Sequence, residues 1–267
     1  MASYVADLQT AGRVVFTRVE AQKALNLKQD AFLKRARRLE KQGLLYSPRR
    51  GYYVIVPPQF KSWGAPPPSW FIDDLMQYEE CAYYVGLLKA AELHGASHQA
   101  VMEFQVVTSM RLPALQAGRS LIKFYYRRDL GPIAGSIQAM KTDTGRMCVS
   151  SPELTAFDLV RYPHAGAGLD HILTVLVDLG AKLDATKLAA LATAFEQPVQ
   201  QRLGYLLERA GHTSVTKSLH ASLTRGTSLR WSELEPAHAT DPDFAPAPLE
   251  RDSRWHLIVR RMPEADQ

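Results

Sequence analysis

Residues 17–56 decide the fold of the N-terminal part of the chain, and they read TRVEAQKALNLKQDAFLKRARRLEKQGLLYSPRRGYYVIV. Thr17 and Glu20 open this stretch with the Thr-x-x-Glu pattern of a capping box, in which the hydroxyl and the carboxylate each bond to a backbone N–H at a helix start. The pattern predicts a short helix over 18–25. Asn26 follows this helix and can adopt the left-handed conformation of a tight turn. A second helix is therefore predicted over 28–42, ending at Gly43.

The predicted helix over 28–42 has two chemically different faces. Phe32, Ala36 and Leu39 recur at i, i+4 and i+7, which places them on one apolar stripe that faces a core. At about 100° per residue, the opposite side carries Lys34, Arg37, Arg38 and Lys41, with Lys28 and Arg35 at its flanks. A recognition helix needs this division, because one face must be anchored while the other enters the major groove of DNA.

Residues 44–56 complete the module with a predicted β-hairpin. Residues 44–46 and 52–56 form its strands, and the turn Ser47-Pro48-Arg49-Arg50-Gly51 places two arginines at the tip. A helix-turn-helix followed by such a hairpin predicts a winged helix that binds duplex DNA, with the wing on phosphates or in the minor groove. The alternatives are a basic face that is only solvated and a winged helix that docks a protein.

The predicted DNA contacts lie on both helices and on the wing. Gln29 is the candidate for reading a base, since an amide side chain can bond to adenine through both of its polar atoms. The full set is Thr17, Lys28, Gln29, Lys34, Arg35, Arg37, Arg38, Lys41, Arg49 and Arg50.

Charge is divided unevenly along the chain and supports this assignment. Residues 1–65 hold 12 Lys and Arg against four Asp and Glu, a net charge of +8, so the remainder carries −3 of the overall +5. The asymmetry localises any surface that binds a polyanion to the N-terminal quarter.

Composition excludes several classes of protein. The chain has 267 residues with 46% hydrophobic and 22% charged content, which is typical of a globular protein long enough for two domains. No apolar run is long enough to span a bilayer, and the N-terminus lacks the pattern of a signal peptide, so a cytoplasmic protein with no membrane partner is expected. Cys81 and Cys148 are the two cysteines, which predicts neither a disulfide framework nor a cysteine zinc cluster.

The proline-rich stretch over 57–68 predicts a domain boundary. The expected division is a winged helix over 1–57, a linker over 58–68 and a C-terminal domain over 69–267. In the C-terminal domain, periodicity predicts a helix over 70–94 that Gly95 stops, and then strands over 104–108, 121–126 and 133–140, with 147–150 as a candidate fourth strand. Ser151-Pro152-Glu153 predicts a helix start. Further helices are predicted over 169–179, 187–195 and 199–210.

The expected fold class is α+β: an N-terminal winged helix-turn-helix followed by a larger mixed domain with a small sheet plus helices. The tail from residue 227 is expected to be irregular, with candidate strands near 229–231 and 255–260.

No motif predicts catalysis, so the chain is expected not to be an enzyme and to need no cofactor and no metal. His94 and His98 have the i, i+4 spacing of a helical metal site, but Gly95 lies between them and no acidic ligand is near, which favours a turn or surface role. The glycines at 166 and 168 lack the Gly-Lys-Ser/Thr ending of a phosphate loop. Nuclease Glu-x-Lys or Asp-x-Lys and hydrolase Gly-x-Ser-x-Gly patterns are absent from the sequence. Helix-surface or buried polar roles are the better interpretation of three further residues, namely Asp158, Arg202 and Tyr205.

The chain resembles the AbiEi antitoxin family of bacterial type IV toxin–antitoxin systems, over roughly residues 5–215. The segments that carry the resemblance are RGYYVI at 50–55, YYVGLLKAA at 83–91 with HGA at 94–96, FQVVT at 104–108, SPELTAFDL at 151–159 and RLGYLLE at 202–208. The resemblance implies an N-terminal winged helix that represses its own operon by binding inverted repeats, and a role in phage defence. It also implies a C-terminal domain that neutralises a nucleotidyltransferase-like toxin, with direct contact left open. The alternative is a stand-alone regulator whose second domain senses a ligand or docks a protein.

Overall fold

The computed structural model describes residues 1–96, 102–225, 228–235 and 246–265. They form two compact units. Unit 1 comprises Met1–Val85, Met102–Leu130 and Ala139–Val149, and unit 2 comprises Gly86–Val101, Gly131–Gln138 and Ser150–Gln267. The chain passes between the units several times, so each unit consists of several separate segments. The expected division into domains at 1–57, 58–68 and 69–267 stays a prediction. The α+β class is confirmed.

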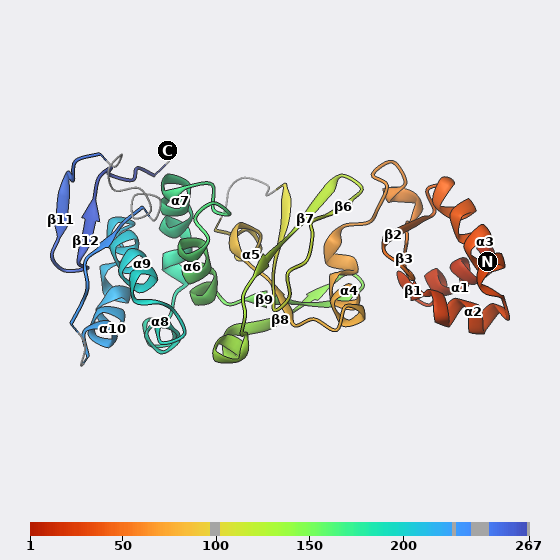
Figure 1. Cartoon of the computed structure of the whole chain (residues 1–267), viewed down its shortest axis with the longest axis horizontal. Coiled ribbons are helices and arrows are strands. Elements are labelled where there is room, and N and C mark those ends of the chain that lie inside the picture. The colour runs from red at the N-terminus through yellow and green to blue at the C-terminus, as the bar shows by residue number, and fades with distance from the viewer. Residues whose placement is uncertain (97–101, 226–227, 236–245, 266–267) are drawn as a thin grey trace. The chain divides into compact units, whose positions relative to one another are not determined.

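A winged helix begins unit 1. Its elements are α1 (Ala2–Thr10), β1 (Val15–Thr17), α2 (Arg18–Leu25), α3 (Gln29–Lys41), β2 (Leu45–Arg49) and β3 (Tyr52–Ile55). The strands form an antiparallel sheet in the order β1-β3-β2 (Figure 1). Its core contains the ring of Tyr53, whose centroid lies 5.4 Å from those of both Phe16 and Phe32. Both predicted helices and the hairpin are confirmed, while α1 and β1 were not predicted.

A six-stranded mixed sheet lies mostly in unit 1. Its order is β6-β7-β5-β4-β9-β8, formed by Leu115–Ala117, Ser120–Tyr126, Glu103–Thr108, Tyr83–Val85, Gly145–Ser150 and Ile137–Thr142. The strands β5 and β7 run parallel in register over six residues, from Glu103↔Leu121 to Thr108↔Tyr126. These strands and β9 confirm the predictions for 104–108, 121–126 and 147–150. The predicted strand over 133–140 is wrong in its first half, because Gly131–Ser136 form the 3₁₀ helix η3.

The single helix predicted over 70–94 is wrong. The structure has the 3₁₀ helix η2 (Pro68–Trp70), α4 (Ile72–Tyr78), β4 (Tyr83–Val85) and α5 (Leu87–Leu93) in its place. Tyr83–Val85 are strand residues because they bond to β5 on one side and, at Val85, to β9 on the other. Glu80 and Leu87 flank the strand with φ values of 51° and 59°, which the interior of one continuous helix cannot contain. Gly95, at φ 64°, ends α5 as predicted.

The proline-rich segment is folded. It contains two 3₁₀ helices, η1 (Pro58–Phe60) and η2, and the ring of Phe60 lies 5.3 Å from Trp63 and 5.0 Å from Trp70 between centroids. Gly118, in the turn between β6 and β7, approaches the backbone of this segment so closely that an added Cβ would lie 2.1 Å from the Trp63 carbonyl oxygen. The segment therefore packs against the β6–β7 turn.

Helices dominate unit 2. They are α5, α6 (Pro152–Arg161), α7 (Leu169–Leu179), the 3₁₀ helix η4 (Gly180–Lys182), α8 (Ala185–Ala192), α9 (Gln197–Arg209) and α10 (Thr213–Thr224). Ser151 caps α6, since its hydroxyl accepts a hydrogen bond from the Leu154 N–H at 3.3 Å. The side chains of α6 are buried along nearly its whole length, which makes it the central helix of the unit. Among the described residues, no helix combines the length and the apolar content needed to cross a bilayer.

The tail is more ordered than expected. It forms a three-stranded sheet in the order β10-β12-β11, from Ser232–Glu233, Leu257–Val259 and Glu250–Asp252. The strand expected near 255–260 is confirmed, the one expected at 229–231 begins slightly later, and β11 and α10 were not predicted.

Candidate nucleic-acid interface

Local interactions define both ends of α2. The Thr17 hydroxyl accepts a hydrogen bond from the Glu20 N–H at 3.2 Å, which confirms the predicted cap of α2. Arg13 bonds to the Glu20 carboxylate, and this guanidinium together with the Thr17 N–H lowers the pKa of Glu20. At the other end of α2, Asn26 has φ 48° and ψ 48°, the left-handed conformation expected of it. The turn from α2 into α3 is thus set by the left-handed Asn26, and α3 itself begins after Lys28 without a side-chain cap.

The two faces of α3 differ as predicted. Phe32, Ala36 and Leu39 are buried in the core of the winged helix. The cations and Gln29 are exposed, namely Lys28, Gln29, Lys34, Arg35, Arg37, Arg38 and Lys41. None of these six cations forms an ion pair with a carboxylate in the part of the chain that the structure describes. Their charge is therefore available to a polyanion, on a helix that the core holds in place.

The wing presents its two arginines differently. Arg50 is exposed at the tip, where its backbone carbonyl accepts a hydrogen bond from the Tyr78 hydroxyl at 2.9 Å. Arg49 is mostly covered, and its Nε donates to the Glu79 carboxylate at 2.7 Å. A contact of either arginine with DNA stays a prediction, and Arg49 is already paired with Glu79.

Arg18 belongs to this surface and was not predicted as part of it. Its backbone N–H donates to the Gly51 carbonyl at 2.7 Å, which ties the start of α2 to the wing turn. Its Nε is buried and has no hydrogen-bond partner in the described structure. Its signal in the sequence was its place directly after the cap Thr17, at the start of α2.

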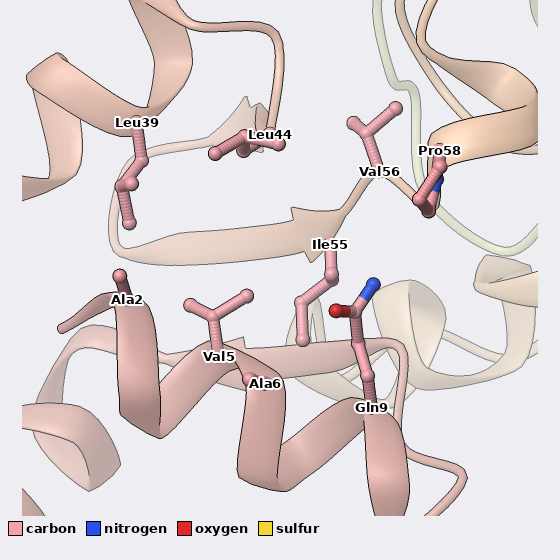
Figure 2. A pocket seen from close by; sticks show the side chains of 9 residues that line it. All are labelled: Ala2, Val5, Ala6, Gln9, Leu39, Leu44, Ile55, Val56 and Pro58. Atoms are coloured by element: carbon pink, nitrogen blue, oxygen red, sulfur yellow. The ribbon is translucent and has the colours of Figure 1, made fainter.

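A pocket of about 130 Å³ also opens on the winged helix (Figure 2). Its walls come from α1, the end of α3, the residue before β2, β3 and the residues after β3, namely Ala2, Val5, Ala6, Gln9, Leu39, Leu44, Ile55, Val56 and Pro58. Gln9 is the one polar side chain among these nine, and none is ionisable. The lining of the pocket is therefore mostly apolar and carries no charged side chain, whereas the predicted DNA-contacting cations of the module lie at α3 and the wing.

Residues 84–209 match the family model of the AbiEi antitoxin C-terminal domain. The chain carries a domain of the AbiEi antitoxin family. The resemblance inferred from the sequence motifs is thereby confirmed over residues 84–209, which supports an antitoxin role. The AbiEi family is not typically enzymatic.

The fold as a whole is also known from a crystal structure. The RV2827C protein from Mycobacterium tuberculosis superposes with a TM-score of 0.68 over 96% of this chain and 89% of that chain, at 16% sequence identity. At that identity the likeness concerns the fold alone. No curated protein matches the sequence.

Three polar residues of the AbiEi domain were considered as functional candidates, and the structure shows where each of them lies. Asp158 is fully buried in α6. The Arg202 Nε donates to the Glu233 carbonyl at 2.9 Å, and burial lowers the pKa of this guanidinium. Burial raises the pKa of Tyr205, whose hydroxyl donates to the Met262 sulfur at 3.6 Å. Asp158 and Tyr205 are buried and Arg202 is partly buried, and the interpretation of their roles as structural stays a prediction.

The histidine motif is accounted for in part. His94 follows α5, and its Nε2 lies 2.7 Å from the Ser150 carbonyl oxygen. His98 lies outside the described residues. Across the described ranges, no three His, Cys, Asp or Glu side chains are grouped as metal ligands.

The AbiEi domain is completed by residues beyond its matched range. Gly204 lies within α9, and a Cβ at this position would lie 2.1 Å from a ring carbon of Trp255. Trp255 is fully buried and immediately precedes β12. The glycine in the RLGYLLE motif is therefore explained by the indole that lies over it.

Proposed function

We propose that the chain is a cytoplasmic, DNA-binding antitoxin that represses its own operon through the winged helix and counters a nucleotidyltransferase-like toxin through its AbiEi domain. One observation carries the DNA-binding half. The exposed face of α3 holds six cations without ion pairs among the described residues, while its opposite face is locked into the core.

The energetics favour a duplex as the ligand of this face. Each phosphate contact releases condensed counterions, so binding weakens with salt by a slope of roughly 0.9 per contact. Gln29 lies at the start of α3, and the N-terminal residues of a recognition helix are those that reach base edges. The cations therefore supply affinity for the backbone, and Gln29 supplies a preference for an adenine.

Binding of the full chain to its promoter fragment tests this assignment. The variant R37A/R38A should bind more weakly at physiological salt and should lower the salt slope by about two units. The matched control is K217A/R225A, which removes the same charge from exposed positions on and after α10. Equal binding by R37A/R38A and the wild type would show that the assigned face is wrong.

Replacement of Gln29 separates base reading from backbone binding. Gln29→Ala should cost roughly 1 to 3 kcal/mol on the operator and leave binding to unrelated DNA unchanged. An equal loss on both DNAs would remove Gln29 from the base-reading role.

Rescue of cells that express the neighbouring toxin gene tests the antitoxin half. The full-length R37A/R38A variant should rescue as well as the wild type, because the proposal assigns toxin neutralisation to the AbiEi domain. If neither protein rescues at any expression ratio, the antitoxin role fails. Co-purification of the toxin with the chain distinguishes direct contact from indirect antagonism.

A further inference from the structure

The wing is held by residues of α4 and its neighbours, which follow the proline-rich segment within unit 1. The Tyr78 hydroxyl donates to the Arg50 carbonyl, and the Glu79 carboxylate accepts from Arg49. The rings of Tyr52 and Tyr78 lie 5.2 Å apart between centroids. We refer to Arg49, Tyr52, Tyr78 and Glu79 as the wing clamp.

The backbone of the turn is built to fit the clamp. Gly51 has φ 87°, a conformation that L side chains rarely adopt. A Cβ at Gly51 would also lie 3.0 Å from the Tyr78 hydroxyl oxygen, so the glycine leaves room for Tyr78 to reach Arg50. The tip of the wing is consequently held on one side by Tyr78 and on the other by the N–H of Arg18.

The two arginines of the wing differ in whether a carboxylate pairs with them. The side chains of Arg49 and Glu79 are 20% and 21% exposed, so their attraction is screened less than that of a surface pair. If Arg49 moved to a phosphate, Glu79 would be left unpaired and half-buried next to a polyanion, which is costly. Arg50 has no such partner among the described residues and is exposed.

We propose that Tyr78 and Glu79 position the wing for DNA binding, with Arg49 as its anchor and Arg50 as the wing's phosphate contact. The inference rests on the proposed function, since it assumes that the winged helix binds DNA. It assigns a role to α4, which lies outside the winged helix and before the matched AbiEi range.

Salt-dependent binding of the full chain to the promoter fragment tests the two roles. R50A should lower the salt slope by about one unit. R49A and E79A should each weaken binding roughly three- to tenfold, the effect of losing one partly buried charged hydrogen bond, with the salt slope unchanged. The double variant R49A/E79A should be no weaker than either single variant, because both remove the same interaction.

Charge reversal and a neutral variant guard against a merely structural explanation. R49E/E79R should recover most of the lost affinity, which damage to the fold could not do. Y78F keeps the ring and the charge but loses the bond to Arg50, so it should weaken binding without changing the slope. E80Q is the matched control, because Glu80 is exposed, adjacent to Glu79 and has no ion pair in the described structure.

A measurement without DNA separates failure of the inference from failure of the proposed function. Amide hydrogen exchange over 45–55 should become faster in R49A, E79A and Y78F and stay unchanged in E80Q. If the wild type fails to bind the promoter, the proposed function fails whatever the exchange shows. If the wild type binds, three results would each overturn the wing clamp: a lower slope in R49A, tighter binding by E79A, or no recovery in R49E/E79R.

Discussion

Replacing Gly204 with alanine tests whether the C-terminal strands are part of the core of the AbiEi domain. In an ordinary helix interior this change would stabilise a protein by about 1 kcal/mol, because alanine restricts the unfolded chain. At Gly204 the new Cβ would lie 2.1, 2.2 and 2.5 Å from three ring carbons of Trp255. Cβ contacts under 3.0 Å essentially never occur, so the indole or α9 must shift.

The expected sign follows from the size of the two effects. Over-packing of a tight core costs about 1 to 3 kcal/mol, and an overlap with a rigid, fully buried ring belongs near the upper end. Subtracting the gain of about 1 kcal/mol leaves a net loss of about 2 kcal/mol. For a unit of this size the loss should lower the Tm by roughly 4 to 8 °C.

Thermal unfolding followed by tryptophan fluorescence and far-UV circular dichroism measures this shift. Gly135→Ala is the control, because a Cβ at Gly135 meets nothing within 4 Å. On a W255L background, which makes room at the site, G204A should cost clearly less, since the two residues act on one contact. A Tm for G204A equal to or above that of the wild type would refute the packing of Trp255 on α9.

Two further expectations concern helix capping and pH. Thr17→Ala should destabilise the winged helix by about 1 kcal/mol through loss of the α2 cap, seen as faster amide exchange in α2. Thr10→Ala should be nearly neutral, since that exposed hydroxyl bonds only within α1, and an equal effect of both changes would contradict the capping argument. The Arg261 guanidinium and the Glu264 N–H lower the pKa of Asp170 below its ordinary value of 3.8. The stability from this carboxylate is therefore present above about pH 4 and lost as the pH falls through the lowered pKa. Asp170→Asn should accordingly lower the Tm at pH 7 but not at the acid end of the titration, and a difference that persists there would exclude this linkage.

Sequence signals were reliable where a few neighbouring residues carry the whole physical cause. Thr17 and Glu20 are three residues apart, so the cap of α2 forms from local contacts alone. The apolar stripe of α3 and the hydroxyl cap at Ser151 are local in the same sense. Such signals predicted both helices, the hairpin and the exposed basic face of the winged helix.

Local periodicity failed where partners lie far away in the chain. Tyr83 fitted a helical pattern with Leu87 and Ala91, yet it belongs to β4 because β5 supplies its hydrogen-bond partners. A segment that is buried on all sides has similar composition in a helix and in a strand, so periodicity alone does not separate them. The error over 70–94 has this origin.

By itself, the sequence determined the winged helix, its charged face and the family of the domain that follows, because capping, helical periodicity and motif order are written in adjacent residues. Tertiary structure alone decided which charges remain available and what covers each helix. Arg49 looks like Arg50 in sequence, but Glu79, thirty positions away, pairs with only one of them. Trp255 explains Gly204 from outside the matched range. Such pairings depend on how distant segments meet, and the free energy that selects them comes from the packed core rather than from local propensity.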